Sequence, residues 1–314
     1  MEINREMLLQ SFREETEECL QQMEQLLLAL ETRPEDRELV SSLFRAAHTI
    51  KGNASLLEFN ALARFLHNVE DLLDLGRSNI VVLTQEVISI LLQAVDVLRL
   101  FTKLKARLAP YLQVAARHAH TAGIPMMRAM ALEFPSDRAC SHLERQYMLG
   151  DDLLVAPVLS ADGDISYYVP EGTWTHFLTG ERVEGGRWAR ERHGFMSVPL
   201  LARPAAVIPV GAVDDRPDYN HAEGVTLRVY ELPDGASVTT VIPASTGDDA
   251  CAFTTSRHAG VIRIDAADAP SAWHALLVGV HAVSAVDGGT AVPDEQGTLI
   301  TAESQTLLIT LNRP

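Results

Sequence analysis

The sequence has 314 residues, 47% of them hydrophobic, and a formal net charge of −16 at pH 7. This length and apolar content suffice for two or three domains, each with a core of its own. The negative charge and the lack of a cluster of Lys and Arg argue against nucleic acid and anionic membrane as partners, because both bind to clustered cations.

The N-terminal stretch MEINREMLLQSFREETEE is acidic and lacks the basic and then apolar layout of a signal peptide. No apolar run reaches the ~18–20 residues of a membrane span, so we expect a cytoplasmic protein without a membrane partner. Cys19, Cys140 and Cys251 are widely separated, and we expect reduced thiols rather than disulfides. No spacing typical of metal ligands or of a cofactor-binding motif is visible, and we expect neither a metal nor a cofactor.

The composition changes near residue 105. One of the fifteen prolines and two of the nineteen glycines precede this point, whereas all six tyrosines and all three tryptophans follow it. Residues that break helices are therefore concentrated in the second part. We predict helices in the first part and mainly strands and turns in the second.

In the first part, apolar residues recur at helical spacing in four stretches. The first predicted helix spans about 4–31, the apolar stripes of the next two lie at 40–57 and 62–73, and a turn follows over 76–79. The fourth helix opens at Thr84, a residue type that caps helix N-termini. Four helices joined by short loops predict an antiparallel bundle.

His48 lies at the edge of the apolar stripe of the second predicted helix, where solvent reaches it. Lys51 and Gly52 follow three and four residues later on the same face, so an ammonium group can approach the imidazole and no side chain stands beside it. A glycine inside a helix costs about 1 kcal/mol relative to alanine, and room for a docking partner would explain its presence. This face suits an approaching phosphoryl group.

His67 and Glu70 lie one turn apart on the third predicted helix, on a face that meets His48 if the two helices are antiparallel neighbours. A carboxylate that accepts a hydrogen bond from one ring nitrogen leaves the other with a free lone pair, which nucleophilic attack on phosphorus requires. The alternative is an ordinary solvated helix surface. The spacing by itself leaves both interpretations open.

Residues 1 to about 95 resemble a histidine phosphotransfer domain of the chemotaxis histidine kinase type, through LFRAAHTIKGNASLLEF and ARFLHNVEDLLD. The resemblance implies that His48 is the phosphoacceptor. It also implies roles for the residues around it, with Lys51 and Gly52 as its flank and His67 and Glu70 as the hydrogen-bonding partners of the imidazole.

Two residues, Leu57 and Glu58, stand where this family usually has glycine or another small residue. The remaining sequence shows no glycine-rich ATP-binding segment and no acidic pocket of the receiver type. The resemblance therefore implies two partners: a histidine kinase catalytic domain acting in trans, and the receiver domain of a response regulator.

The second part resembles the C-terminal end of family 31 glycoside hydrolases, the α-xylosidase and α-glucosidase group, through LKARLAPYL, GIPMMRAMALEFPSD, RQYMLGDDLLVAPV and YYVPEGTWTHFLTGE. In that family these residues form the last helix of the catalytic barrel and the β-domains that follow it, and the catalytic aspartates lie on the barrel. We expect a helical bundle at 1–104, a continued helix at 105–123, and β-sandwich modules at 124–210 and 211–314.

The fourth predicted helix runs into LKARLAPYL without a cap, glycine or proline, so we expect it to be continuous to Pro110. In the glycosidase family that this part resembles, apolar residues of this stretch face the catalytic barrel. In this sequence the helical bundle takes the position of that barrel. We expect an exposed apolar strip that promotes self-association, formed by Leu100, Phe101, Leu104 and Leu108.

Retaining glycoside hydrolysis needs two carboxyl groups about 5–5.5 Å apart. The adjacent aspartates at 151–152 and 214–215 have diverging side chains and belong to no recognisable motif, so we interpret them as solvated turn residues. Trp174 and Trp188 either stack on a sugar or pack in a core, and packing is the favoured interpretation.

Together these features predict a multi-domain α plus β protein, an antiparallel helical bundle followed by two all-β sandwich modules. We interpret the chain as a phosphorelay protein that carries a non-catalytic glycosidase remnant. The alternative is an α-xylosidase- or α-glucosidase-related protein that hydrolyses O-glycosyl bonds or binds carbohydrate, in which the bundle is incidental. Whether the chain is itself an enzyme stays open.

Overall fold

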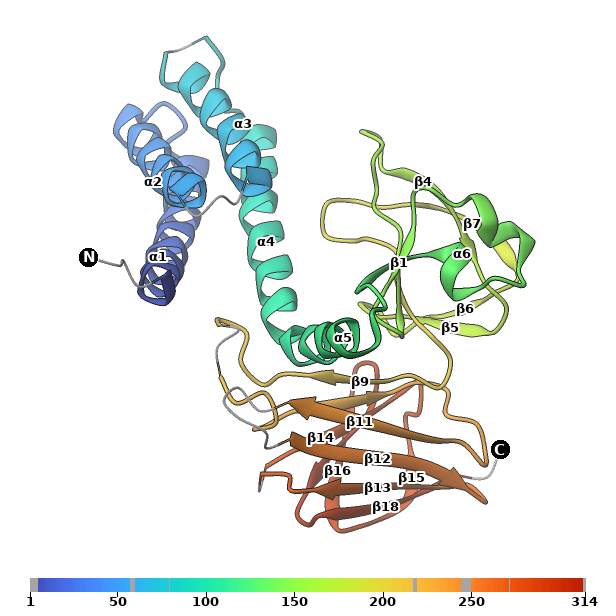
Figure 1. Ribbon diagram of the computed structural model, residues 1–314. Helices are drawn as coiled ribbons and strands as arrows, with labels where there is room; N and C mark the ends of the chain where they lie inside the picture. Colours follow the sequence, from blue (N-terminus) through green and yellow to red (C-terminus); the bar gives the residue numbers. More distant parts are fainter. Residues whose placement is uncertain are drawn as a thin grey trace. The chain divides into compact units, whose positions relative to one another are not determined.

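The computed structural model describes residues 5–56, 60–78, 80–216, 219–243, 250–270 and 272–312 (Figure 1). The chain divides into two compact units, Met1–Thr102 and Lys103–Pro314. The described part of the first unit is helical and that of the second is mostly β, which confirms the predicted α plus β class. Leu57 and Glu58, where the sequence departs from the phosphotransfer pattern, lie outside the described residues. Within the described ranges, no helix is long and apolar enough to cross a membrane.

The predicted helices of the first unit are observed as α1 (Arg5–Thr32), α2 (Arg37–Leu56), α3 (Asn60–Arg77) and α4 (Gln85–Arg107). Capping side chains mark two of their starts. Asp36 accepts hydrogen bonds from the N–H groups of Glu38 and Leu39 at 3.1 and 3.3 Å, and the Thr84 hydroxyl accepts one from Val87 at 3.4 Å. Helix α3 continues to Arg77, into the stretch predicted as a turn.

One core joins the four helices, which confirms the predicted bundle. The four apolar stripes meet in it, and each fully buried Leu or Ile contributes roughly 1.5–3 kcal/mol to stability. Its most buried members include Leu27, Leu30, Leu43, Ala47, Ile50, Leu66, Leu73, Ile88, Leu91 and Val95. On α4, the Arg99 guanidinium contacts Glu24 and, at 3.7 Å, Glu17 of α1. Ion pairs at the rim thus accompany the apolar contacts in the centre.

The helix predicted to run unbroken to Pro110 is interrupted. Helix α4 ends at Arg107, and α5 (Ala109–Ala122) begins after Leu108, with the proline in its first turn. Proline has no N–H to donate to a carbonyl four residues earlier, so it fits only the start of a helix. At the other end, Gly123 has a φ of 72° and donates its N–H to Ala119.

The expected exposed apolar strip near the end of α4 is not formed. Leu108 is 6% exposed and lies in a core with residues of the β-sheets, and Leu104 packs against the same core. Leu100 and Phe101 are half-buried. The strip therefore gives no structural reason for self-association, because the neighbouring β-structure covers its C-terminal end.

The second unit begins, after α5, with a mixed layer of sheet and short helix. A six-stranded sheet has the order β1-β2-β3-β8-β5-β6, and β4 pairs with β7 in a separate two-stranded ribbon (Figure 1). The six strands are β1 (Met127–Ala129), β2 (Tyr147–Leu149), β3 (Leu153–Val155), β5 (Thr173–His176), β6 (Arg182–Glu184) and β8 (Leu200–Ala202). The ribbon consists of β4 (Asp164–Val169) and β7 (Arg187–Arg192), and the short helices are α6 (Met130–Glu133) and a 3-10 helix (Arg138–His142).

Sheet and ribbon share one apolar core, in which the aromatic residues are Tyr167, Tyr168 and Trp174. Trp174 is 1% exposed, and its indole N–H donates to the carbonyl of Pro170 at 2.9 Å. The favoured interpretation of Trp174 as a packing residue is confirmed. Trp188 on β7 differs, because it is 56% exposed.

Two five-stranded sheets follow, with the orders β16-β17-β14-β10-β9 and β11-β12-β13-β18-β15. Their strands are β9 (Val207–Val210), β10 (Thr226–Val229), β11 (Ser237–Pro243), β12 (Ala250–His258), β13 (Val261–Ala267), β14 (His274–Val278), β15 (Val283–Asp287), β16 (Gly289–Asp294), β17 (Gly297–Ala302) and β18 (Thr306–Leu311). Both sheets contribute to one core around Phe253 and Trp273, as in a β-sandwich. The sheets were predicted to be antiparallel, but β10 pairs with β14 in parallel. The chain between them passes through β11–β13 of the other sheet, which gives the crossover that a parallel pair needs.

Candidate functional site

The packing of α2 against α3 brings His48 and Glu70 into contact. Glu70 Oε1 lies 2.9 Å from Nδ1 of His48. The Glu70 side chain is 6% exposed, whereas the His48 side chain is 62% exposed. An ionised carboxylate can only accept a hydrogen bond, so Nδ1 is the donor in this contact, and in the neutral imidazole the lone pair is then on Nε2. Among the described residues, Nε2 of His48 has no hydrogen-bonding partner.

Lys51 pairs with the same Glu70 carboxylate. Its ammonium group contacts Oε2, the oxygen that His48 leaves free. The lysine side chain is 24% exposed, so a cation lies at the partly open edge of the site, beside the imidazole. This arrangement places a positive charge where a phosphoryl group bound to His48 would bring negative charge.

His67 occupies a more distant position. Its Nδ1 lies 4.0 Å from Glu70 Oε2, and its Nε2 lies 3.7 Å from Asp71 Oδ2. Both separations exceed hydrogen-bonding distance, and the structure gives no hydrogen bond or ring contact between these two described histidines, His67 and His48. The structure thus joins Glu70 directly to the imidazole and leaves His67, 61% exposed, at the rim.

Gly52 leaves open space on the face of α2 that carries His48. A Cβ built at this position would meet no atom within 4 Å, apart from those of the helix itself and the adjoining residues. Packing against the described residues therefore does not require a glycine here. Because Gly52 has no side chain, the helix surface beside His48 stays open to an approaching molecule.

Phe44 is a neighbour of His48 that the sequence interpretation did not single out. Its ring is stacked on the imidazole, with centroids 6.0 Å apart and planes at 16°, and the Arg77 guanidinium lies 4.7 Å from the centre of the Phe44 ring. The spacing of four residues between Phe44 and His48 was a usable signal, because such residues lie one above the other on a helix.

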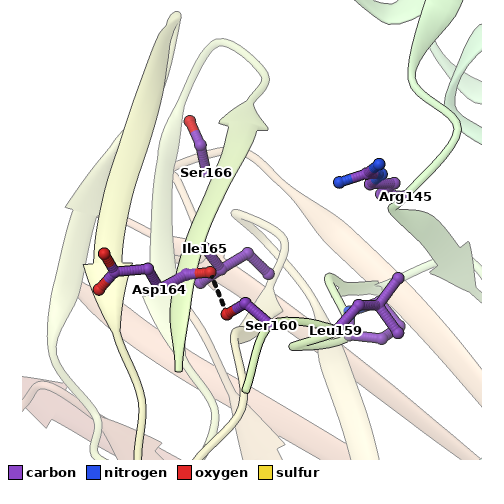
Figure 2. A pocket seen from close by; sticks show the side chains of 7 residues that line it. Arg145, Leu159, Ser160, Asp164, Ile165 and Ser166 are labelled. Atoms are coloured by element: carbon purple, nitrogen blue, oxygen red, sulfur yellow. Dashed lines mark hydrogen bonds between the residues drawn. The ribbon is translucent and has the colours of Figure 1, made fainter. Parts of the chain in front are cut away.

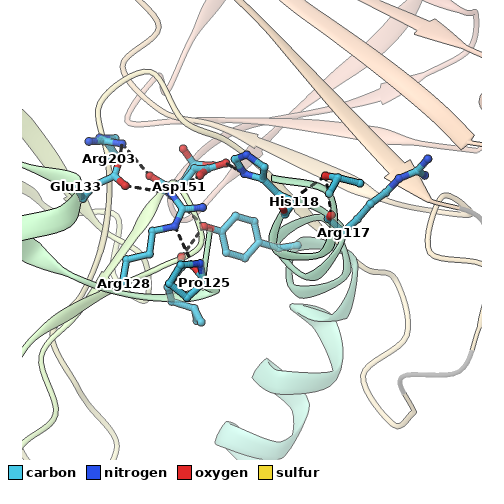
Figure 3. A network of polar contacts seen from close by, with 11 residues as sticks. Arg117, His118, Pro125, Arg128, Glu133, Asp151 and Arg203 are labelled. Atoms are coloured by element: carbon cyan, nitrogen blue, oxygen red, sulfur yellow. Dashed lines mark hydrogen bonds and ion pairs between the residues drawn. The ribbon is translucent and has the colours of Figure 1, made fainter. Parts of the chain in front are cut away.

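Asp151 lies in a turn and is 50% exposed, as expected for a solvated turn residue, but it also takes part in an ion-pair network (Figure 3). The buried Arg128 contacts Asp151 Oδ1 at 2.5 Å and Glu133 Oε2 at 3.0 Å, and Arg203 contacts Glu133 Oε1 at 2.8 Å. Burial, with the nearby charge of Asp151 as a second cause, raises the pKa of Asp152 to about 7. The carboxylates of Asp151 and Glu133 are thus paired with arginines, whereas the structure gives no ion pair for Asp152 among the described residues.

Metal-binding side chains do not gather in the described part of the chain. No three His, Cys, Asp or Glu residues there are placed to hold an ion. Cys19, Cys140 and Cys251 are free thiols.

Three family models match successive parts of the chain. The Hpt domain matches residues 7–101, the glycosyl hydrolase family 31 C-terminal domain matches 123–208, and the C-terminal domain of the α-xylosidase YicI matches 220–312. These matches confirm the predicted combination of a phosphotransfer domain with domains of a family 31 glycosidase.

Curated relatives divide in the same way. The chain is 43% identical over 142 residues to an α-xylosidase of Emericella nidulans, covering 43% of this chain and 18% of that protein. It is 39% identical over 111 residues to the chemotaxis protein CheA of Treponema pallidum, covering 35% of this chain and 14% of that protein. The chain thus spans less than a fifth of the length of either relative.

Solved structures resemble the chain in fold. A GH31 dextranase of Flavobacterium johnsoniae complexed with glucose has a TM-score of 0.60 at 20% identity, and the match covers 72% of this chain and 33% of that one. The GH31 α-xylosidase of Xanthomonas citri has a TM-score of 0.51 at 23% identity, with coverages of 67% and 24%. The chain therefore joins a histidine phosphotransfer domain at residues 7–101 to C-terminal domains of the family 31 glycoside hydrolase type at residues 123–208 and 220–312.

Proposed function

We propose that the helical unit is a phosphorelay module in which His48 accepts and passes on a phosphoryl group. Nε2 attacks the γ-phosphorus of ATP held by a histidine kinase catalytic domain in trans, the bond from that phosphorus to the bridging oxygen breaks, and ADP leaves. The proton stays on Nδ1. A carboxylate oxygen of a receiver-domain aspartate then attacks the same phosphorus, and the P–N bond breaks with its electron pair returning to Nε2.

The contact between Glu70 and Nδ1 carries this proposal. It is made by a buried carboxylate to an exposed imidazole, so it sets the tautomer while leaving the reacting nitrogen accessible. Glu70 also offsets the positive charge that the ring gains when Nε2 bonds to phosphorus. Lys51 offsets the negative charge of the phosphoryl oxygens, and Gly52 leaves room for the partner domain. His67, which lies beside Glu70, is proposed to support its position.

The second unit is proposed to be non-catalytic in this chain. Its Asp151 carboxylate pairs with Arg128, and Arg203 donates to the backbone carbonyl of Asp151, which engages this residue in packing rather than in attack on a glycosidic bond. The alternative is a carbohydrate-active protein, as the names of the α-xylosidase relatives indicate. Turnover of an aryl α-xyloside by the purified chain would support that alternative.

Phosphorylation tests the proposal directly. The chain is incubated with the kinase core of a chemotaxis-type histidine kinase and radiolabelled ATP, and we expect a label that is labile in acid and stable in base. His48→Gln should abolish it because the amide has no nucleophilic nitrogen. His120→Gln, on the exposed surface of α5, is the matched control and should leave the label unchanged. Full labelling of His48→Gln, or no labelling of the parent chain by any kinase core of this type, would contradict the assignment.

A further inference from the structure

Among the described residues, the imidazole of His48 makes one hydrogen bond and stacks on one ring. The hydrogen bond joins Nδ1 to Glu70 Oε1 at 2.9 Å, and the ring is that of Phe44, with centroids 6.0 Å apart and planes at 16°. A single hydrogen bond fixes one edge of the imidazole but lets it turn about the axis through that bond. A stacked neighbour limits this freedom, because it sets the orientation of the ring plane.

The plane of the imidazole decides the direction from which a phosphoryl donor must approach. The lone pair of Nε2 lies in the ring plane, so the phosphorus atom has to come toward the edge of the ring and not toward its face. Phe44 stacks on a face, and the His48 side chain is still 62% exposed. Alignment matters here, since productive attack requires the reacting atoms to lie about 3–3.5 Å apart with their orbitals aligned.

Phe44 is itself held in place by two kinds of contact. Its ring is partly buried and packs against the core of the bundle. The Arg77 guanidinium lies 4.7 Å from the centre of the same ring, which is a cation–π distance. Arg77 in turn donates a hydrogen bond to Asp74 Oδ1 at 2.5 Å. The ring on which the imidazole stacks is therefore fixed both by the core and by a cation that is anchored on its own helix.

The packing of α2 against α3 forms both contacts at once. Phe44 and His48 lie about one turn apart on α2, and their partners Arg77 and Glu70 lie about two turns apart on α3. Side chains of a helix lean toward its N-terminus, so the long arginine can make up the difference. Helix α3 thus contacts the site twice, through Glu70 at the edge of the imidazole and through Arg77 at the ring beside it.

We propose that Phe44 positions His48 for phosphoryl transfer and that Arg77 acts through Phe44. Glu70 determines which ring nitrogen faces outward, and the stack with Phe44 determines the plane in which its lone pair points. Phe44 does not touch the phosphoryl group, so it is a positioning residue and not a catalytic one. This inference rests on the proposed phosphorelay function and extends it to a ring and a cation that carry none of the transferred charge.

Phosphoramidate tests the positioning without a kinase, because this small donor needs no docking surface. Nε2 bonds to its phosphorus, the P–N bond of the donor breaks, and ammonia leaves. In the full chain, with His48→Gln as the background, we expect Phe44→Leu to slow phosphorylation by about threefold to tenfold. Phe44→Tyr keeps an aromatic ring and should retain most of the parent rate. Leu98→Ala is the stability control, since this residue also packs on the core of the bundle, and it should keep the parent rate.

A double substitution tests whether Arg77 acts through the ring. Arg77→Gln should slow the same reaction by less than Phe44→Leu does. The double variant should be no slower than Phe44→Leu alone, because substitutions that remove one shared contact are not additive. Arg145→Gln is the charge control and should keep the parent rate. It removes a guanidinium group from the Lys103–Pro314 unit, where this arginine lines a cavity of about 300 Å³ (Figure 2).

The kinase core with ATP is the second donor, and it separates positioning from docking. Phe44→Leu should lower the maximal rate of labelling and leave the half-saturating concentration of kinase core unchanged. A parent rate in Phe44→Leu, an equal loss in Phe44→Tyr or an equal loss in Leu98→Ala would overturn the positioning role of the ring. Losses that add in the double variant, or an equal loss in Arg145→Gln, would overturn the role of Arg77. A parent chain labelled by neither donor would instead overturn the phosphorelay function, and this inference with it.

Discussion

Glu70 is a buried carboxylate whose two oxygens serve different residues. One oxygen holds Nδ1 of His48 and the other contacts the ammonium group of Lys51. Removing this charge affects the imidazole twice, because the ring loses both its fixed tautomer and the group that offsets its positive charge. The side chain is 6% exposed, so water cannot readily take its place.

We therefore expect Glu70→Gln to slow phosphorylation of His48 by roughly tenfold or more, measured as the initial rate of labelling by the kinase core. Asp71→Asn is the matched control, since this neighbouring carboxylate is 64% exposed and makes no contact with His48. An unchanged rate in Glu70→Gln, with the bundle still folded, would show that the carboxylate does not orient the ring.

Asp152 makes the second unit sensitive to pH. Its pKa is raised from 3.8 to about 7 in the folded state, so between about pH 4 and pH 7 the folded state binds more protons than the unfolded state. The free energy of unfolding must then fall as pH rises through this window. The largest effect that this shift allows is about 4 kcal/mol.

Asp152→Asn should abolish this dependence, because an amide does not titrate. We expect urea unfolding to show that the parent loses stability from pH 5 to pH 8 and that the variant loses less. Asp287→Asn, at an exposed position of β15, should behave as the parent does. A parent chain whose second unit is equally stable at both pH values would contradict the burial of this carboxylate.

At the scale of the element, helix α2 carries a residue that weakens it. Gly52 lies inside the helix, where alanine is more favourable by about 0.5–1 kcal/mol. A Cβ there would meet no atom within 4 Å beyond the helix itself and the adjoining residues, so nothing in the described chain opposes the substitution. A helix that keeps such a residue is expected to use the space for contact with another molecule.

Gly52→Ala should accordingly stabilise the helical unit by about 0.5–1 kcal/mol and slow phosphotransfer. Thermal unfolding measures the first effect, and the rate of transfer from kinase to His48 and on to a receiver domain measures the second. Thr49→Ala, an exposed position of the same helix, should raise stability without slowing transfer. Faster unfolding, or undiminished transfer, in Gly52→Ala would show that the glycine has a different role.

At the scale of the whole molecule, the two units have separate cores. The core of the bundle contains residues of α1 to α4, whereas the β-structure has cores of its own, one of which includes Leu108 and Tyr111. The division between the units falls within α4, after Thr102. Since the core of the bundle and the cores of the β-structure have no buried residue in common, each unit should respond to its own substitutions.

We expect calorimetry to resolve two unfolding transitions. Gly52→Ala should shift one of them and Asp152→Asn the other. In the same way, Trp188→Ala should leave phosphorylation of His48 unchanged. A single transition that both substitutions shift together would show that the units fold as one.

The sequence by itself determined features that depend on near neighbours along the chain. Helical periodicity placed His48, Lys51 and Gly52 on one face, and the four helices of the bundle were predicted within a few residues of their observed positions. Short motifs also identified both parts of the chain, since each motif is a continuous run of residues.

Tertiary structure decided what depends on residues far apart in the chain. The contact of Glu70 with His48 joins positions 22 residues apart and exists only because α2 packs against α3, and the same packing leaves His67 at the rim. Packing of sheet against ribbon buries Trp174 and exposes Trp188, two residues that composition could not distinguish. The parallel pairing of β10 with β14 and the covering of Leu108 likewise depend on which segments meet, because burial and strand partners are properties of the folded chain and not of local sequence.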